Sequence, residues 1–209
     1  MKKEKITRAT LDELEKTMPV LSENEQRNCT GGYRYYDESG MFIEKIGDEN
    51  EIRIINRTNY NNIKPESGNF GIRDMEILES FSTSLSSACS LNVKEAVIRS
   101  IAMELSVNDI QFFYDSSNTA AGRFNTLTGE ISINMESSVI GNNNYYDIYL
   151  TIVHEKQHKD TTIDMRTDYS ELQAYLTVRN HIYFCNCSEN YKSSIEKQIG
   201  ILGGKLNNH

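Results

Sequence analysis

The sequence predicts an α+β fold in which a small antiparallel sheet is combined with C-terminal helices. Short runs of alternating apolar and polar residues, separated by glycine or asparagine turns, lie within residues 35–55 and 110–134. Segments with apolar residues at helical spacing lie between these two stretches and continue to the C-terminal end. Strand groups and helix groups that are segregated along the chain are typical of α+β domains.

Composition and charge narrow the class of protein. The 209 residues suit one domain with a short appendage, and 25% charged with 38% hydrophobic residues is globular usage. The net charge of −8 provides no broad basic surface, so nucleic acid is excluded as a partner. No run of 18 consecutive apolar residues occurs, so we expect no membrane span.

Residues 1–32 form a separate segment that we interpret as a leader. Four apolar residues recur at helical spacing and a Gly31-Gly32 pair follows; the four are Leu11, Leu14, Met18 and Leu21. Pro19 should end or kink this helix near Met18. The alternative interpretation is an N-terminal amphipathic helix that packs on the domain and stays attached.

The run from Leu11 to Gly32 resembles the double-glycine leaders of Bacteroidales precursor peptides and exported proteins. The resemblance implies that the peptidase domain of an ABC exporter binds the apolar stripe and cuts after Gly32. The mature chain, residues 33–209, would then begin at Tyr33 and act outside the cytoplasm, in the extracellular space or the periplasm. Cys29-Thr30 stands where an apolar residue is common in that family.

The first half of the mature chain predicts strands and then helices. Residues 35–36 and 41–43 flank a turn at 38–40, and 51–55 is a third alternating run, so we expect a small β-meander. Helical spacing in 72–88 and 93–105 predicts two helices with a break near Ser90.

The second half predicts a hairpin followed by three helices. A short strand is expected at 110–114, and residues 123–125 and 130–134 should pair as a hairpin. Helical spacing then predicts helices at 146–159, 169–184 and 189–202.

A metal-binding motif lies near the end of the helix at 146–159. His154 and His158 are four residues apart, so a helix places them about 40° from each other on one face, where both imidazoles can grip one ion. Glu155 lies beside His154, where a general base can take a proton from a water molecule. The apolar run Leu150–Val153 predicts that this helix end is buried. The spacing therefore predicts a Zn²⁺ site.

A catalytic zinc needs a third protein ligand, for which there are two candidates. HEKQH followed by Glu171-Leu172-Gln173-Ala174 resembles the gluzincin branch of the zincin peptidases, which implies Glu171 as the ligand. Asp164 stands six residues after His158, the position of the third ligand in the metzincin pattern, but Thr161 replaces the glycine of that pattern. We prefer Glu171.

Other candidate residues surround this motif. Tyr175 lies one turn beyond Glu171 and is our candidate oxyanion donor, with a core tyrosine as the alternative. His181 is expected to be a structural histidine. By the zincin resemblance, the strand at 130–134 would bind an extended peptide by strand addition.

The sequence therefore predicts a zinc metallopeptidase that hydrolyses peptide or protein substrates. The alternative is an exported binding or antagonistic protein in which the HEKQH segment is inert or structural. A disulfide from Cys185 or Cys187 to Cys89 is expected if the protein is exported.

Overall fold

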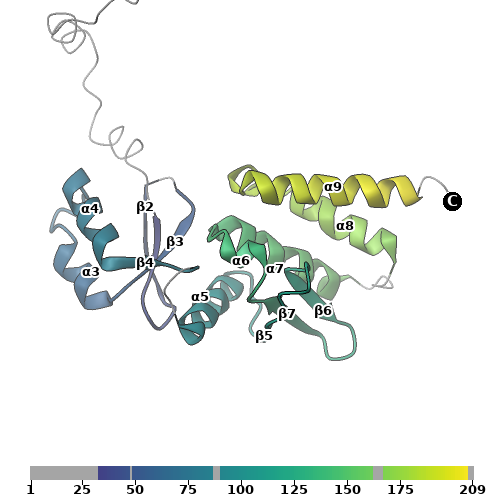
Figure 1. The fold of residues 1–209 in the computed structure, drawn as a ribbon, viewed down its shortest axis with the longest axis horizontal. Helices are drawn as coiled ribbons and strands as arrows, with labels where there is room; N and C mark the ends of the chain where they lie inside the picture. Colours follow the sequence, from purple (N-terminus) through teal and green to yellow (C-terminus); the bar gives the residue numbers. More distant parts are fainter. Residues whose placement is uncertain (1–32, 48, 87–89, 162–166, 207–209) are drawn as a thin grey trace, which may run out of the picture.

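The computed structural model describes residues 33–47, 49–86, 90–161 and 167–206, which form a mixed α+β fold with two small sheets (Figure 1). The α+β prediction is confirmed. The predicted leader, including Gly31 and Gly32, lies outside the described residues, as does Asp164. No helix among the described residues is both long and apolar enough to cross a bilayer.

The N-terminal sheet has four strands in the order β2-β1-β3-β4. Their bounds are Tyr33–Tyr36 for β1, Phe42–Ile46 for β2, Glu51–Ile55 for β3 and Ser82–Ser84 for β4. β1 pairs antiparallel with β2 but parallel with β3, so the predicted meander is wrong. β1 is central because Tyr35 and Tyr36, on its opposite faces, are both fully buried, whereas β2 is half exposed and suits an edge.

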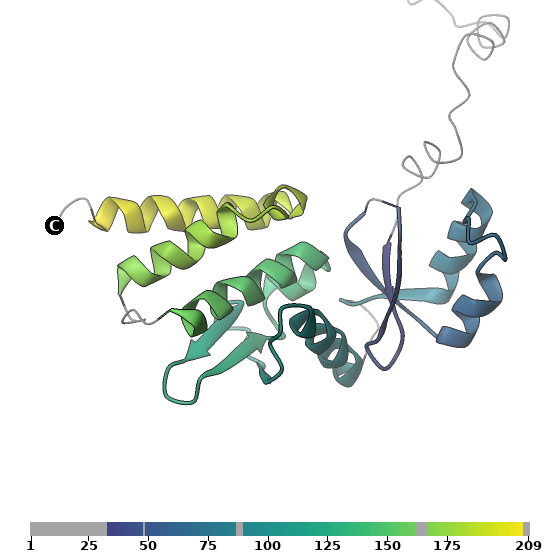
Figure 2. The same ribbon diagram turned by 180° about the vertical axis from the view of Figure 1, so that it is seen from behind.

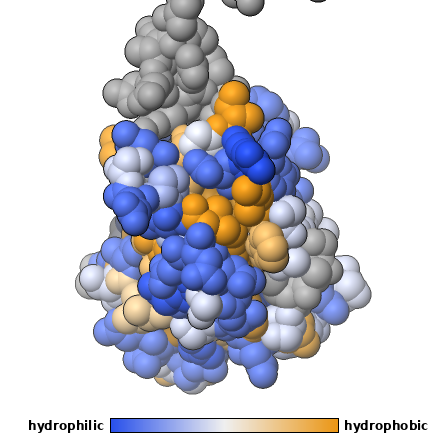
Figure 3. All heavy atoms as spheres, turned by 90° about the vertical axis from the view of Figure 1, so that its left-hand side faces the viewer, coloured by the Kyte–Doolittle hydropathy of each residue, from blue (hydrophilic) through white to orange (hydrophobic). Residues whose placement is uncertain are grey.

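Two helices cover one face of this sheet, α3 (Arg57–Ile63) and α4 (Ile72–Phe81). α3 was not expected; the Asn56 side chain caps it by accepting hydrogen bonds from two backbone N–H groups. α4 is shorter than the predicted helix at 72–88, because the serine-rich residues of β4 pair with β3 instead. On the molecular face at this end, hydrophobic residues gather in a band between polar ones (Figure 3).

The second sheet has the order β5-β7-β6. It consists of β5 (Ile110–Phe113), β6 (Gly122–Asn125) and β7 (Glu130–Asn134). The β6–β7 hairpin is confirmed, but β5 runs parallel to β7, so neither sheet is purely antiparallel. β7 is paired on both sides and cannot accept a peptide strand. Among the described strands, the edge next to the motif helix is β6, which corrects our prediction for residues 130–134.

The remaining helices surround the second sheet. They are α5 (Leu91–Glu104), α6 (Ser138–Gly141), α7 (Tyr145–Asp160), α8 (Asp168–Arg179) and α9 (Glu189–Leu206), with a 3-10 turn η1 (Phe184–Asn186). α8 ends before the predicted Phe184, because Tyr183 and Phe184 turn back to pack on the main core. Figures 1 and 2 show α7 between the second sheet and the α8–α9 pair.

The described residues contain two hydrophobic clusters. The larger one joins α5, α7 and both sheets, and the smaller one lies between α3, α4 and the opposite face of the N-terminal sheet. Asn143, just before α7, joins this part of the chain to the N-terminal sheet, because its side chain accepts a hydrogen bond from Leu85 N–H and donates one to the Ile52 carbonyl. α7 is thus fixed within the larger cluster, where it positions the metal-binding motif.

Candidate metal centre

α7 is a capped and largely buried helix. Asn144 begins it by accepting hydrogen bonds from the N–H groups of Tyr146 and Asp147. The predicted burial of its C-terminal half is confirmed: Leu150 and Ile152 are fully buried. Polar side chains at a buried helix end are shielded from water, which therefore does not compete for their hydrogen bonds or ligands.

The three motif side chains share this environment. His154, Glu155 and His158 are 9%, 6% and 4% exposed. Buried polar groups of this kind require partners. The neighbouring helix α8 supplies one of them.

α8 begins so that Glu171 faces α7. Thr167 caps the helix by accepting a hydrogen bond from Ser170 N–H, which places Glu171 in the first turn. α8 packs directly against α7. The packing of α8 on α7 therefore brings Glu171 to the two histidines.

Candidate ligand atoms of three residues lie close together. The Nε2 atoms of His154 and His158 are 3.3 Å apart. Oε2 of Glu171 lies 3.4 Å from His154 Nε2, and Oε1 lies 3.3 Å from His158 Nε2. Among the described residues, this is the group of histidine, cysteine and acidic side chains that could hold a metal ion.

Each of these distances is close to the spacing of two ligands on a zinc ion, and Glu171 approaches the two histidines with different carboxylate oxygens. In a tetrahedral site with zinc–ligand bonds of about 2.0–2.1 Å, neighbouring ligand atoms lie about 3.3–3.4 Å apart. Two neutral imidazoles at this separation can share only one proton, whereas a cation would be bound by both nitrogens and by the carboxylate. The donor set of two imidazoles and one carboxylate is the type that zinc prefers.

Comparison with protein-family models, with curated proteins and with solved structures finds no significant match. The geometry of this chain therefore carries the functional argument.

The electrostatics keep Glu171 charged and hold Glu155 closer to neutrality. Hydrogen bonds from His154 and His158 lower the pKa of Glu171 to about 2. Burial raises the pKa of Glu155, against the opposing effect of the two histidines. The hydrogen bond to Glu171 raises the pKa of His158. One carboxylate is thus ionised for binding a cation, and the other has the raised proton affinity that a general base uses.

Tyr175 lies against the site. Its ring centroid is 4.5 Å from that of His154, and its side chain lines the same pocket. Burial raises the pKa of Tyr175 to about 12, so its hydroxyl stays protonated at neutral pH. Among the described residues, no group forms a hydrogen bond with the buried His154 Nδ1, and the ring of Tyr175 packs against this imidazole.

The site opens into a pocket of about 540 Å³ formed by β6, α7, α8 and α9. Gly122 of β6 lies directly over the general-base candidate: a Cβ on Gly122 would be 2.8 Å from Oε1 of Glu155. Sequence reasoning missed Gly122, which is the first residue of β6 and precedes the predicted strand at 123–125; a glycine in a strand can mark the close approach of another group. It also missed the α9 residues that face the pocket. Their spacing shows that they share one side of the helix, but only the packed structure shows that this side faces the pocket.

The other sequence candidates lie apart from the pocket. His181 is structural as expected: its Nδ1 accepts a hydrogen bond from Tyr183 N–H, and its ring contacts Tyr149. Cys185 is exposed and Cys187 is buried, and neither forms a disulfide with another described residue. Cys89 lies outside the described residues, so the disulfide with it stays a prediction.

Proposed function

We propose that the protein is a zinc-dependent peptidase of the zincin type. The observation that carries the proposal is the convergence of His154, His158 and Glu171 at 3.3–3.4 Å beside the buried carboxylate of Glu155. Three ligands leave a fourth tetrahedral position for water or substrate, as catalytic zinc sites require. Glu171, and not Asp164, is the third ligand in this proposal.

The chain's own residues account for the proton transfers. A zinc ion in the site would lower the pKa of a water molecule towards neutrality and polarise the scissile carbonyl. Glu155 then takes the proton from water and delivers it to the leaving amine, so hydrolysis needs no covalent intermediate with the protein. Tyr175, protonated at neutral pH, donates a hydrogen bond to the developing oxyanion.

The edge strand β6 is the substrate-binding strand in this proposal. Ala121 and Asn125 direct their carbonyls towards the β7 side, where they accept from Asn134 and Gly129 N–H groups. Strand alternation therefore turns the backbone groups of Gly122 and Phe124 towards the open edge. An extended peptide added there would pass next to Glu155.

Metal analysis of a Glu155→Gln variant tests this function. The purified chain should bind about one zinc ion, and Glu155→Gln should retain it while losing hydrolysis of casein by about 10²–10⁴-fold. Glu136→Gln, an exposed glutamate, is the matched control and should hydrolyse casein normally. Absence of zinc, or normal hydrolysis by Glu155→Gln, would exclude the peptidase and favour a non-catalytic binding protein.

We also propose that the enzyme is exported after cleavage at Gly31-Gly32 by an ABC exporter with a leader peptidase domain. The support is the resemblance of residues 11–32 to double-glycine leaders. Mass spectrometry of the protein recovered from outside the cytoplasm should find Tyr33 as the N-terminus. An exported chain that retains residues 1–32 would contradict the proposal.

A further inference from the structure

The wall of the pocket opposite β6 is a row of polar side chains on α9. Asn190, Ser194 and Gln198 line the pocket and recur every four residues, so they lie along one side of the helix. Within the described residues, the three side chains make no hydrogen bond to the protein. Their amide and hydroxyl groups are therefore available to a ligand in the cleft.

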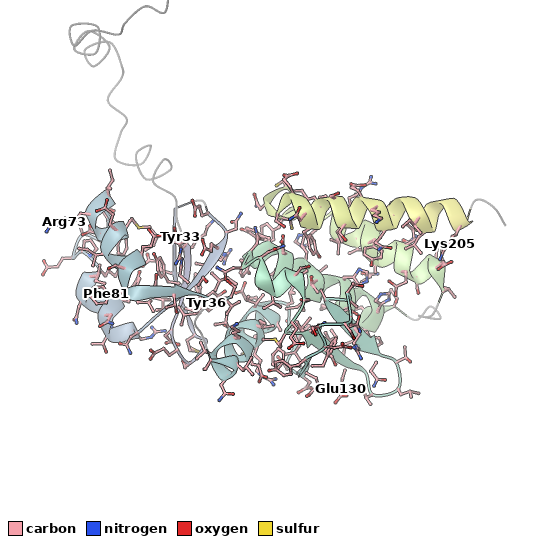
Figure 4. The ribbon with its side chains drawn as sticks, in the orientation of Figure 1. Tyr33, Tyr36, Arg73, Phe81, Glu130 and Lys205 are labelled. Carbon is pink, nitrogen blue, oxygen red and sulfur yellow. The ribbon has the colours of Figure 1, made fainter. Side chains whose placement is uncertain are left out.

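α9 holds this row in a fixed place. Tyr191 and Ile195, which adjoin the row on the helix, are buried in the main core. The Tyr191 hydroxyl lies 3.4 Å from Oγ1 of Thr151, one turn before His154 on α7. At its beginning the helix is fixed to α7 through Ser188, which donates to Asp147 from its backbone N–H and its hydroxyl. In Figure 4, α9 runs along α8, and α7 lies below both helices in this view.

The two walls have similar lengths. Asn190 to Gln198 spans about 12 Å along the helix axis at about 1.5 Å per residue. Gly122 to Asn125 of β6 spans about 10 Å at about 3.4 Å per residue. Each wall thus covers about four residues of an extended peptide.

The chemistry of the row favours contact with the peptide main chain. Asparagine and glutamine side chains carry both donors and an acceptor, which match the N–H and C=O groups of a peptide unit. The charged residues of the pocket are the site carboxylates and Arg123. The guanidinium of Arg123 lies 3.7 Å from the centroid of the Phe113 ring on β5, so this charge already has a partner within the protein.

We infer that Asn190, Ser194 and Gln198 bind the main chain of an extended substrate opposite β6, so that the enzyme accepts unfolded segments with little regard to side-chain sequence. This inference rests on the proposed peptidase function. It assigns the three residues a positioning role, because none of them is within the metal site.

Peptide binding to an inactive protein tests the inference separately from catalysis. Glu155→Gln protein is titrated against a fluorescein-labelled unstructured casein peptide, and against a scrambled peptide of the same composition, with anisotropy as the readout. Replacing Asn190, Ser194 and Gln198 by alanine in this background should lower the affinity for both peptides equally, by about tenfold or more. Each lost hydrogen bond should reduce the affinity a few-fold.

The matched control is the pair Ser193→Ala and Lys197→Ala, neighbouring exposed residues of α9 outside the pocket lining. Control and row variants should both keep stoichiometric zinc and an unchanged thermal midpoint. If the triple variant is less stable, the single Gln198→Ala variant replaces it and should still weaken binding several-fold.

The outcomes separate the two proposals. In the active enzyme, the row variants should raise KM for casein and leave kcat unchanged. Unchanged peptide affinity in the row variants, or a loss confined to one of the two peptides, overturns the inference and leaves the peptidase function standing. Loss of zinc or of Glu155-dependent hydrolysis in the parent protein overturns the function instead, whatever the peptide affinities.

Discussion

Gly122 and Glu155 approach each other so closely that a side chain on the glycine would have to displace the carboxylate. A Cβ at position 122 would lie 2.8 Å from both Cγ and Oε1 of Glu155. The edge strand therefore touches the proposed general base directly, and the position of one depends on the other.

Gly122→Ala should impair catalysis without removing the metal. The added methyl group must displace the buried Glu155 carboxylate, so we expect kcat for casein to fall at least about tenfold while zinc content stays near one per chain. Gly200→Ala, where an added Cβ meets no atom within 4 Å, is the control and should retain full activity. Full activity in Gly122→Ala would contradict the proposed role of Glu155.

Glu171→Gln should weaken zinc binding strongly. The substitution removes the charge of a proposed ligand, so we expect the zinc Kd to rise by more than the about 10–100-fold typical of residues that only orient ligands. Competition with a chromogenic chelator measures this constant. Asp168→Asn, an exposed acid in the same first turn, should leave the Kd unchanged. If Asp164→Asn loses zinc while Glu171→Gln still binds it, Asp164 and not Glu171 is the third ligand.

Tyr175→Phe should lower kcat with little effect on zinc. The phenylalanine ring keeps the packing on His154, whereas the lost hydroxyl removes the proposed oxyanion donor. Single oxyanion donors contribute about 10²–10³ to kcat in other enzymes, and a secondary donor should give at least about tenfold. Tyr169→Phe, a half-exposed tyrosine of the same helix, serves as the reference. Equal kcat values for Tyr175→Phe and Tyr169→Phe would show that Tyr175 only packs against His154 and does not donate to the oxyanion.

Asp147→Ala should destabilise the fold by about 2–4 kcal/mol. Asp147 is fully buried and accepts two hydrogen bonds from Ser188, which join α7 to the start of α9. Urea unfolding measures the change. Asp160→Ala breaks an exposed pair with Lys156 on the same helix and should cost less than about 0.5 kcal/mol. Similar losses in both variants would show that the Asp147 contact does not hold α9.

The stabilising effect of Asp37 should disappear in acid. Burial opposes ionisation of Asp37, but hydrogen bonds from Ser39, Arg57 and the Met41 N–H outweigh it and lower its pKa. Because the unfolded chain binds the proton more readily, this contribution is present above the unfolded pKa of about 3.9 and is lost as the pH falls through the lower folded value.

Urea unfolding of the original chain and of Asp37→Asn at several pH values measures this loss. The stability difference should be constant from pH 5 to 7 and shrink below about pH 4. A stability difference that does not change with pH would show that Asp37 stabilises the fold through packing and not through its charge.

The sequence by itself determined the α+β class and the helix that carries His154, Glu155 and His158. These features depend on local spacing, because positions four apart share a helix face. The choice of Glu171 came from the resemblance of HEKQH and the following Glu171-Leu172-Gln173-Ala174 to the gluzincin pattern. The metal role of these residues stays a prediction, but the structure brings the predicted ligand atoms together.

Only the tertiary structure decided which strand borders the site and what faces it. The pairing of β1 with β3 and the central place of β7 are long-range contacts, which local alternation does not specify. The same holds for Gly122 over Glu155 and for the polar row of α9 across the cleft. Their spacing gains meaning only when packing of Tyr191 and Ile195 into the core sets the rotation of α9, because burial, and not helix propensity, fixes which side faces the cleft.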